Sequence, residues 1–283
     1  MNKVAIVTDS TAYIPKEYLE KYSISVVPQV LIWGEQTFED GVDIQPDEFY
    51  RRLAGAKVMP TSSQPRVSSM KETFSVLLDQ GHSVLGIFVS AKLSGTCQAA
   101  MQLREMLPGG QEKIEIVDSY SASMGMGFQA FAAARAAAEG ASLAECRALV
   151  ENARFRTGVY FVVDTLEFLH RGGRIGGAQR LFGTALNLKP ILALKDGRVD
   201  AIERIRTKRR AMERLVEIVV EQCAGKPAVR LAALDANAPH EARELLDSAS
   251  GQLNVIEKVF ASVSPVVGTH TGPGTIGLGY MTE

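Results

Sequence analysis

The sequence of 283 residues predicts an α/β protein built from two α/β domains. Short apolar runs such as Val4–Thr8 and Val84–Ser90 alternate with amphipathic helical patterns, which favours largely parallel strands. A chain of this length is long for one hydrophobic core. The long helical region ends around Arg154–Gly158, where a new α/β series begins. We therefore predict domains over residues 1–156 and 157–283, joined tightly, with a ligand site in the cleft between them.

Local signals define the elements of the first predicted domain. Pro15 suits the first position of a helix that runs through Lys21. Ser142 and Glu145, three residues apart, form a capping box at the start of another helix. The other expected segments are β-rich stretches over Ile24–Trp33, Val84–Ser90 and Ile114–Asp118, and helices over Pro46–Leu53, Val67–Gln80 and Ser123–Glu139, with one more that follows Thr96 through Met106.

The second predicted domain contains a clear hairpin. Asp196-Gly197 separates the strands Ile191–Leu194 and Val199–Arg206, and this dipeptide is typical of a tight β-turn. A basic amphipathic helix follows over Thr207–Cys223. The remaining expected segments are Val159–Val163, Thr165–His170, Val229–Asp235, Pro239–Ser250, Val255–Val259, Ser264–Gly268 and Thr275–Met281.

Composition excludes several classes of protein. The apolar fraction of 46%, the charged fraction of 22% and the net charge of −1 are those of an ordinary soluble protein, without a global field for nucleic acid or an anionic membrane. Cys97, Cys146 and Cys223 form neither a disulfide framework nor a metal motif, which fits a reducing compartment. The apolar stretches are too short for a signal peptide or a bilayer span. We expect a cytoplasmic protein without stable membrane insertion, nucleic acid or bound metal.

Two hydroxyl-rich loops are the strongest candidates for a binding site. One reads Pro60-Thr61-Ser62-Ser63-Gln64-Pro65 and the other Ser90-Ala91-Lys92-Leu93-Ser94-Gly95-Thr96. Neither contains His, Cys, Asp or Glu, so neither supplies a nucleophile together with its own base. They offer neutral hydroxyl donors and free backbone N–H groups, which suit a carboxylate or a phosphate. This pattern predicts a protein that holds an anion rather than one that converts it.

Each loop also has a purely structural interpretation. Thr61, Ser62 and Ser63 could cap the helix expected from Val67, and we expect one of the three to do so. Ser94 lies at an expected helix start, and Gly95 would let the backbone approach a ligand closely.

Further candidates carry positive or titratable side chains. Arg171-Gly172-Gly173-Arg174 predicts a glycine-bent loop that presents two guanidinium groups to an anion or a partner. His270, in a loop rich in hydroxyls and glycine, is expected to donate a hydrogen bond to an anion or to carry a proton. Asp9 and Ser10 end the first strand, as ligand contacts or as helix caps. The basic run from Arg204 to Arg214 is either a docking surface or a solvated helix face balanced by glutamates.

Several short sequence motifs, or phrases, occur along the chain in the order seen in the DegV family, and the chain resembles that family from Ile6 to Tyr280. The phrases are Val7-Thr8-Asp9-Ser10-Thr11, Ser62-Ser63-Gln64-Pro65, Leu93-Ser94-Gly95-Thr96, Asp118-Ser119, Leu166 with Arg171-Gly172-Gly173-Arg174-Ile175, Leu188-Lys189-Pro190-Ile191, Arg206-Thr207 and His270-Thr271-Gly272-Pro273-Gly274.

The resemblance implies that one long-chain fatty acid, such as palmitate, stearate or oleate, binds in a tunnel between the domains, with no other cofactor. It also implies that the protein presents the carboxylate to a fatty acid kinase, which forms an acyl phosphate. The carboxylate-binding hydroxyls of the family map onto Ser62, where Thr is more usual, and Ser94. Its mouth residues map onto Arg174, Arg206 and His270. The extra hydroxyl of Thr61 leaves open which of two neighbours reaches the ligand.

Two other functions remain as alternatives at this point. The kinship of the family to dihydroxyacetone kinase folds implies a phosphotransfer subunit with His270 as a covalent or acid–base residue. The sequence provides no carboxylate cluster for magnesium and no glycine-rich lysine loop to accompany it. A nucleic-acid-binding regulator would depend on the basic run alone.

Overall fold

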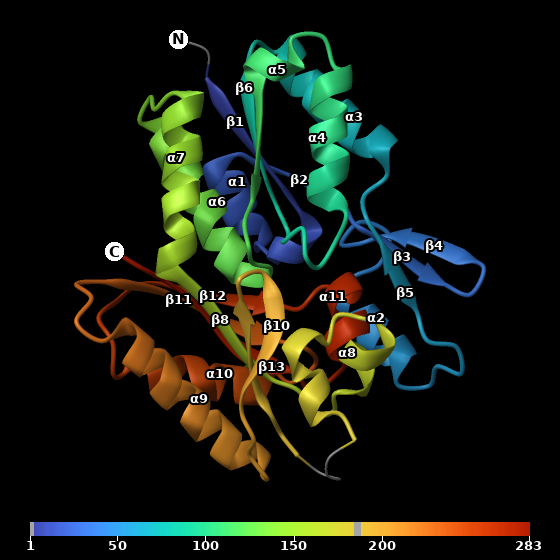
Figure 1. The fold of residues 1–283 in the computed structure, drawn as a ribbon, viewed down its shortest axis with the longest axis vertical. Helices are drawn as coiled ribbons and strands as arrows, with labels where there is room; N and C mark the ends of the chain where they lie inside the picture. Colours follow the sequence, from blue (N-terminus) through green and yellow to red (C-terminus); the bar gives the residue numbers. More distant parts are fainter. Residues whose placement is uncertain (1–2, 184–187) are drawn as a thin grey trace.

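The computed structural model describes residues 3–183 and 188–283, and its first sheet is fully parallel. The strand order is β2-β1-β6-β7 (Figure 1). The carboxyl ends of parallel strands meet at one edge, where ligands commonly bind in open α/β sheets. The strands are β1 (Val4–Asp9), β2 (Ile24–Val27), β6 (Ser83–Phe88) and β7 (Ile114–Asp118).

Helices cover both faces of this sheet (Figure 1). On one face, Met70 and Phe74 pack with Phe88 and Leu103 in a core of their own. On the other face, the Ala- and Gly-rich helix α6 lies close to β1 and β6 because its small side chains permit a near approach. The helices are α1 (Lys16–Tyr22), α3 (Val67–Asp79), α4 (Thr96–Met106), α5 (Gly110–Lys113), α6 (Ser123–Ala138) and α7 (Leu143–Ala153), with the 3-10 turns η1 (Ser10–Ala12) and η2 (Arg154–Arg156).

The predicted capping box is confirmed at the start of α7. Ser142 Oγ accepts a hydrogen bond from the Glu145 backbone N–H at 3.3 Å, and the Glu145 carboxylate accepts one from the Ser142 backbone N–H at 2.8 Å. Two N–H groups that helix geometry leaves without partners are thereby satisfied.

A small antiparallel sheet positions the first hydroxyl-rich segment. It consists of β3 (Val30–Trp33), β4 (Gln36–Glu39) and β5 (Thr61–Ser63), with helix α2 (Pro46–Leu53) nearby. The expectation that Thr61, Ser62 or Ser63 caps the next helix was wrong, because Arg66 occupies the N-cap of α3 and makes no side-chain cap bond. Pairing with β3 instead extends this segment, and alternate side chains of a strand point to opposite faces.

The second large sheet has the order β10-β9-β8-β13-β11-β12 and is mainly antiparallel. The expectation of largely parallel strands was wrong here, because the last strand returns between β8 and β11 and runs antiparallel to both. The predicted hairpin at Asp196-Gly197 is confirmed. The strands are β8 (Thr157–Val162), β9 (Ile191–Lys195), β10 (Arg198–Glu203), β11 (Val229–Asp235), β12 (Val255–Ser262) and β13 (Ile276–Thr282).

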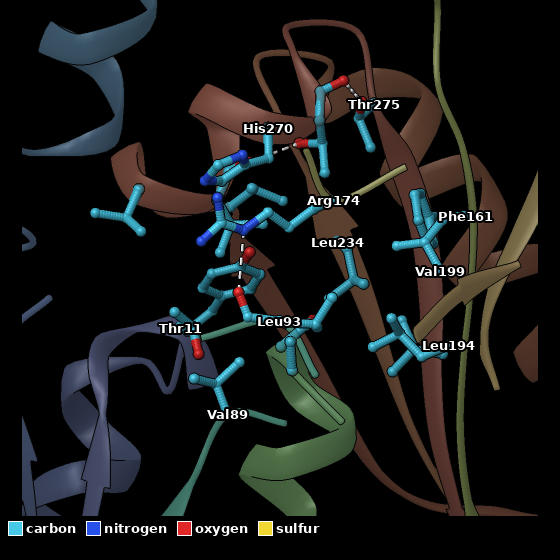
Figure 2. Close-up of a pocket in the computed structure, with 18 of the residues that line it drawn as sticks. Thr11, Val89, Leu93, Phe161, Arg174, Leu194, Val199, Leu234, His270 and Thr275 are labelled. Atoms are coloured by element: carbon cyan, nitrogen blue, oxygen red, sulfur yellow. Dashed lines mark hydrogen bonds between the residues drawn. The ribbon is translucent and has the colours of Figure 1, made fainter. Parts of the chain in front are cut away.

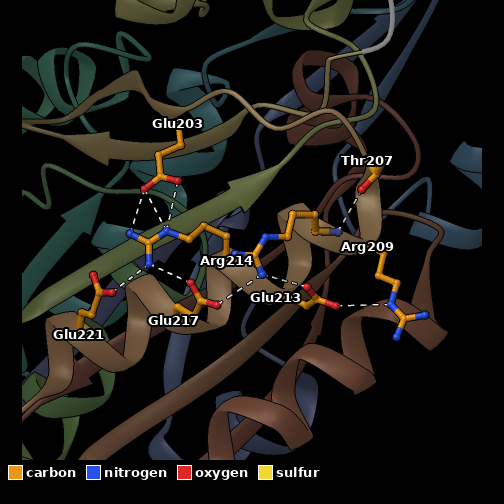
Figure 3. A network of polar contacts seen from close by, with 8 residues as sticks. Glu203, Thr207, Arg209, Glu213, Arg214, Glu217 and Glu221 are labelled. Carbon is orange, nitrogen blue, oxygen red and sulfur yellow. Dashed lines mark hydrogen bonds and ion pairs between the residues drawn. The ribbon is translucent and has the colours of Figure 1, made fainter.

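Ion pairs neutralise much of the basic run on helix α9 (Lys208–Cys223). Arg214 contacts Glu203, Glu217 and Glu221 at 2.9–3.0 Å, and Arg210 contacts Glu213 at 3.1 Å (Figure 3). This part of the run is therefore a solvated helix face balanced by glutamates. The remaining elements are α8 (Glu167–Arg171), η3 (Gly176–Leu181), α10 (Pro239–Ser250) and α11 (Pro265–Thr271).

Helix α6 joins the two halves of the molecule. It packs against β1 and β6 of the first sheet and against β8, β11 and β13 of the second. The strands of the parallel sheet and of the small antiparallel sheet end by Asp118, and those of the β10-β9-β8-β13-β11-β12 sheet begin at Thr157. The division at residues 156 and 157 stays a prediction. None of the helices within residues 3–183 and 188–283 could cross a membrane.

Candidate functional site

A cavity of about 110 Å³ lies between elements of the two halves. Most of its wall is apolar, with Leu194 and Val199 from the β9–β10 hairpin and Phe161 from β8 on one side (Figure 2). Its polar side chains come from distant parts of the sequence. The lining residues include Thr11, Tyr13, Gln29, Ser62, Ser94, Ser123, Arg174, His270, Thr271 and Thr275.

The structure brings Ser62 and His270 into direct contact. Ser62 Oγ and His270 Nε2 lie 2.6 Å apart, although 208 positions separate them in the chain. Strand β5 turns Ser62 toward the cavity, and His270 lies in the last turn of α11. The expectation that His270 lies in a loop was wrong: Pro265 occupies the first turn of a helix there.

His270 is neutral at physiological pH. Burial and, to a smaller extent, the nearby charge of Arg174 lower its pKa to about 4. Its Nδ1 atom has no hydrogen-bond partner in the described part of the chain and packs against Gly172, where a Cβ would overlap it. A buried N–H group without an acceptor is rarer in proteins than a buried acceptor atom without a donor. We therefore leave Nδ1 unprotonated and assign the ring proton to Nε2. His270 then donates to Ser62 and leaves the Ser62 hydroxyl proton for the cavity.

A second hydrogen-bond chain ends at Ser94. Gln29 Nε2 donates to Thr96 Oγ1 at 2.9 Å, and Thr96 Oγ1 lies 2.8 Å from Ser94 Oγ. Thr96 is fully buried, so its own proton needs an acceptor, and Ser94 Oγ supplies one. The hydroxyl proton of Ser94 is then also free to point into the cavity. The two serines therefore form a pair of neutral donors.

Arg174 adds positive charge beside this pair. Its Nε donates to the Leu93 carbonyl at 3.0 Å and its Nη1 to the Gly172 carbonyl at 2.7 Å, so its side chain extends beside His270 (Figure 2). Among the residues that the structure describes, no carboxylate pairs with Arg174 within 4.0 Å. A guanidinium held only by carbonyls keeps its full charge for an incoming anion.

Three predicted site residues do not line the cavity. Thr61 is exposed on the other face of β5, and Gly95 packs against the Gln64 side chain, which a Cβ would overlap. Arg206 is exposed on the surface before α9. Arg171, the other arginine of the predicted glycine-bent loop, forms an ion pair with Glu167 at 2.7 Å.

Asp9 and Ser10 have structural partners. The Asp9 carboxylate accepts hydrogen bonds from the Thr11 and Val89 backbone N–H groups at 3.0 and 2.8 Å, and it caps η1. Ser10 donates to Asp40 at 2.6 Å. Asp9 therefore caps the 3-10 turn η1, whereas neither Asp9 nor Ser10 caps helix α1, whose N-cap is Pro15.

Sequence reasoning missed Gln29, Tyr13 and two threonines of the cavity wall, Thr271 and Thr275. One signal was available: Gln29 is a lone polar residue within the apolar run from Val26 to Leu31, and such a residue needs a buried partner. Thr271 and Thr275 bond to each other through the Thr275 hydroxyl and the Thr271 carbonyl, 2.9 Å apart. Nothing in their sequence context distinguishes them from capping hydroxyls.

This arrangement suits an amphiphilic anion. Apolar walls accept a hydrocarbon chain, while two hydroxyl donors and one guanidinium face the head group. The Ser62–His270 contact lacks the third group that orients the base in nucleophilic catalysis, since Nδ1 has no partner in the described chain. No group of three or more metal-ligating side chains occurs within residues 3–183 and 188–283.

Comparison with known proteins agrees with this chemistry. The chain is 34% identical over 282 residues to a DegV domain-containing protein of Clostridium perfringens, covering 99% of each chain. A fatty-acid-binding DegV family protein of Thermus thermophilus has 34% identity and a TM-score of 0.93, with 99% of this chain and 100% of that chain covered. DegV of Bacillus subtilis, a fatty acid binding protein, has 30% identity and a TM-score of 0.91, with both chains covered completely.

The match to a family model extends over nearly the whole chain. The family model described as an uncharacterised protein of the DegV family matches residues 3–283. The fold, the relatives and this match agree, and the chain belongs to the DegV family.

Proposed function

We propose that this protein binds one long-chain fatty acid, such as palmitate, stearate or oleate. Its carboxylate accepts hydrogen bonds from Ser62 and Ser94 beside Arg174, and its chain occupies the apolar part of the cavity. The observation that carries the proposal is the pair of serine hydroxyls that line one cavity, Ser62 bonded to His270 at 2.6 Å and Ser94 bonded to Thr96 at 2.8 Å. Fatty acid binding by the Thermus and Bacillus relatives supports it.

The apolar wall supplies most of the affinity in this proposal. Burial of a methylene is worth about 0.8 kcal/mol, so a sixteen-carbon acid offers about 12 kcal/mol before ordering costs. The hydroxyls then fix the position of the head group and do not need to drive binding.

We further propose that the protein is a cytoplasmic carrier that presents the carboxylate to a fatty acid kinase, which forms the acyl phosphate. Arg206 is exposed and does not line the cavity, so it is available to a partner while the ligand is bound. His270 is poorly placed for phosphotransfer, because Ser62 occupies one ring nitrogen and Gly172 covers the other.

Organic extraction of protein purified from a bacterial host, followed by gas chromatography, tests the ligand. We expect about one equivalent of long-chain fatty acid per chain, or stoichiometric uptake of added palmitate or oleate by delipidated protein. Absence of both would overturn the proposal.

A reconstituted kinase assay tests the partner. Arg206→Ala is expected to lower acyl-phosphate formation while fatty acid retention stays at the wild-type level. Arg209→Ala is the matched control, because the Arg209 side chain is 92% exposed on the neighbouring helix α9. If Arg206→Ala releases the lipid, or if both variants support the kinase like the wild type, the docking role of Arg206 is wrong.

A further inference from the structure

A relay of buried hydrogen bonds leads to Ser94. Gln29, between β2 and β3, is 2% exposed, and Thr96, at the start of α4, is fully buried. Gln29 Nε2 donates to Thr96 Oγ1 at 2.9 Å, and Thr96 Oγ1 lies 2.8 Å from Ser94 Oγ. Gln29 and Ser94 line the cavity, whereas Thr96 does not. Thr96 therefore acts on a ligand through Ser94.

The Asp9 carboxylate fixes which end of the Gln29 amide faces the relay. Asp9 accepts hydrogen bonds from the Thr11 hydroxyl at 2.6 Å and from the Val89 backbone N–H at 2.8 Å. Burial raises the pKa of Asp9, and a hydrogen bond from the Gln29 side chain is one of the contacts that oppose this rise. A carboxylate accepts hydrogen bonds, so it faces the amide nitrogen and not the amide oxygen. Gln29 is thus the donor at the beginning of the relay.

The relay has one direction. Thr96 Oγ1 accepts the proton of Gln29, and its own proton needs an acceptor because the side chain is buried. Ser94 Oγ is the other hydrogen-bond neighbour of this hydroxyl among the described residues. Ser94 Oγ also accepts from the Thr96 backbone N–H at 3.4 Å. Both lone pairs of the Ser94 hydroxyl are then used, and only its proton is left for the cavity.

A carboxyl group in this cavity experiences opposing influences. The apolar wall and the buried carboxylates of Asp9 and Asp40 favour the neutral acid, and burial raises the pKa of Asp40 to about 6. The guanidinium of Arg174 favours the ionised acid. The other titratable side chains of the wall are uncharged, because burial lowers the pKa of His270 to about 4 and raises that of Tyr13. The balance therefore depends on the hydrogen-bonding groups at the head-group position.

We propose that the relay through Thr96 makes Ser94 a donor only and thereby keeps the bound fatty acid ionised. This inference rests on the proposed fatty acid binding and assigns the form in which that site holds its ligand. A carboxylate accepts the Ser94 proton, whereas the proton of a neutral acid finds no acceptor at Ser94. Gln29 and Thr96 are positioning residues, since they orient the Ser94 hydroxyl.

Thr96→Val tests the relay, because valine has the shape of threonine and lacks the hydroxyl. Ser94 Oγ then loses one donor and is able to accept the proton of a neutral acid. Thr96→Ser is the matched control, since it keeps the hydroxyl. Gln29→Met is a second variant, which leaves Thr96 free to accept from Ser94. Delipidated protein is loaded with palmitate that carries carbon-13 at its carboxyl carbon, and the chemical shift is followed by NMR through a pH titration.

We expect the titration midpoint of bound palmitate to rise by about 0.5 to 1 pH unit in Thr96→Val and to stay at the wild-type value in Thr96→Ser. Gln29→Met should shift it in the same direction as Thr96→Val. Asp40 titrates in all these proteins, so the comparison between variants removes its effect. A purely structural role of Thr96 would weaken binding without moving the midpoint.

An equal or lower midpoint in Thr96→Val, with palmitate still bound, would overturn the relay and leave the proposed function intact. Failure of the wild type to take up palmitate would instead overturn the proposed function.

The wild type alone provides an independent measurement. Palmitate in neutral detergent micelles has apolar surroundings without oriented donors. The midpoint of palmitate bound to the wild type should therefore lie below its midpoint in the micelles. An equal or higher midpoint in the protein would contradict the ionised ligand, whatever the variants show.

Discussion

Removal of the Ser94 hydroxyl is the perturbation that isolates head-group binding. Ser94→Ala deletes one donor to the carboxylate and leaves the apolar wall unchanged. Thr96 still accepts the hydrogen bond from Gln29 at 2.9 Å, but its own buried proton loses Ser94 Oγ as acceptor. The expected loss of affinity therefore combines the missing ligand contact with any shift of the Thr96 hydroxyl.

The magnitude follows from the charge of the acceptor. A hydrogen bond to a charged group contributes about 1.5–3 kcal/mol, so its loss should raise the dissociation constant for the fatty acid about 10- to 150-fold. Ser62→Ala should cost at least as much, since it also leaves His270 Nε2 without its partner at 2.6 Å. Ser62→Thr keeps a hydroxyl and should bind close to the wild type.

The assay is displacement of a fluorescent fatty acid from delipidated protein. Thr61→Ala is the matched control, because Thr61 is exposed on the opposite face of β5, and its effect should stay within about 0.5 kcal/mol. A loss in Thr61→Ala as large as that in Ser62→Ala would refute the assignment of the carboxylate to Ser62. Wild-type affinity in both Ser62→Ala and Ser94→Ala would refute the head-group site.

Three further predictions concern His270, its packing and stability. Burial lowers the His270 pKa from 6.5 to about 4, so the unfolded chain binds more protons in this window, and the stability present above pH 6.5 is lost as pH falls toward 4. Between pH 6.5 and 4 the free energy of unfolding of the wild type should therefore fall by up to about 3 kcal/mol more than that of His270→Gln. Equal pH dependence of the two unfolding free energies would contradict this prediction. Gly172→Ala has a compatible backbone (φ of −73°) but a Cβ that overlaps the His270 ring, so fatty acid affinity should fall while helix content by circular dichroism stays the same; unchanged affinity would show that the ring position does not matter. Ser142→Ala removes the capping box of α7 and should cost about 1 kcal/mol in thermal unfolding without any effect on lipid binding, and an effect on binding would contradict its structural role.

Elements with local signals could be predicted from the sequence. The capping box at Ser142 and Glu145 and the hairpin at Asp196-Gly197 depend on residues next to each other, and both are confirmed. The direction of β13 could not be predicted, because it is set by pairing with strands that are distant in sequence, including β8, more than a hundred residues earlier. Parallel order was inferred from strand–helix alternation, and β13 follows helix α11 in that alternation but runs antiparallel to both of its neighbours.

The site shows the same division between local and distant effects. Ser62, Ser94, Arg174 and His270 were all predicted from the sequence, and all four line one cavity. Their mutual geometry was not predictable. Three hydroxyls in a row lack any alternation of apolar and polar residues, so nothing marked Thr61 to Ser63 as a strand until β3 was seen to pair with it. The contact between Ser62 and His270 likewise exists only in the folded chain.

A crystal structure of the delipidated protein soaked with palmitate tests the central claim most directly. The account predicts carboxylate oxygens within hydrogen-bond distance of Ser62 Oγ and Ser94 Oγ, beside Arg174, with the chain against the apolar wall of Phe161, Leu194 and Val199. A reversed chain, with the carboxylate beside Phe161 and Leu194, or a lipid bound outside this cavity would contradict it.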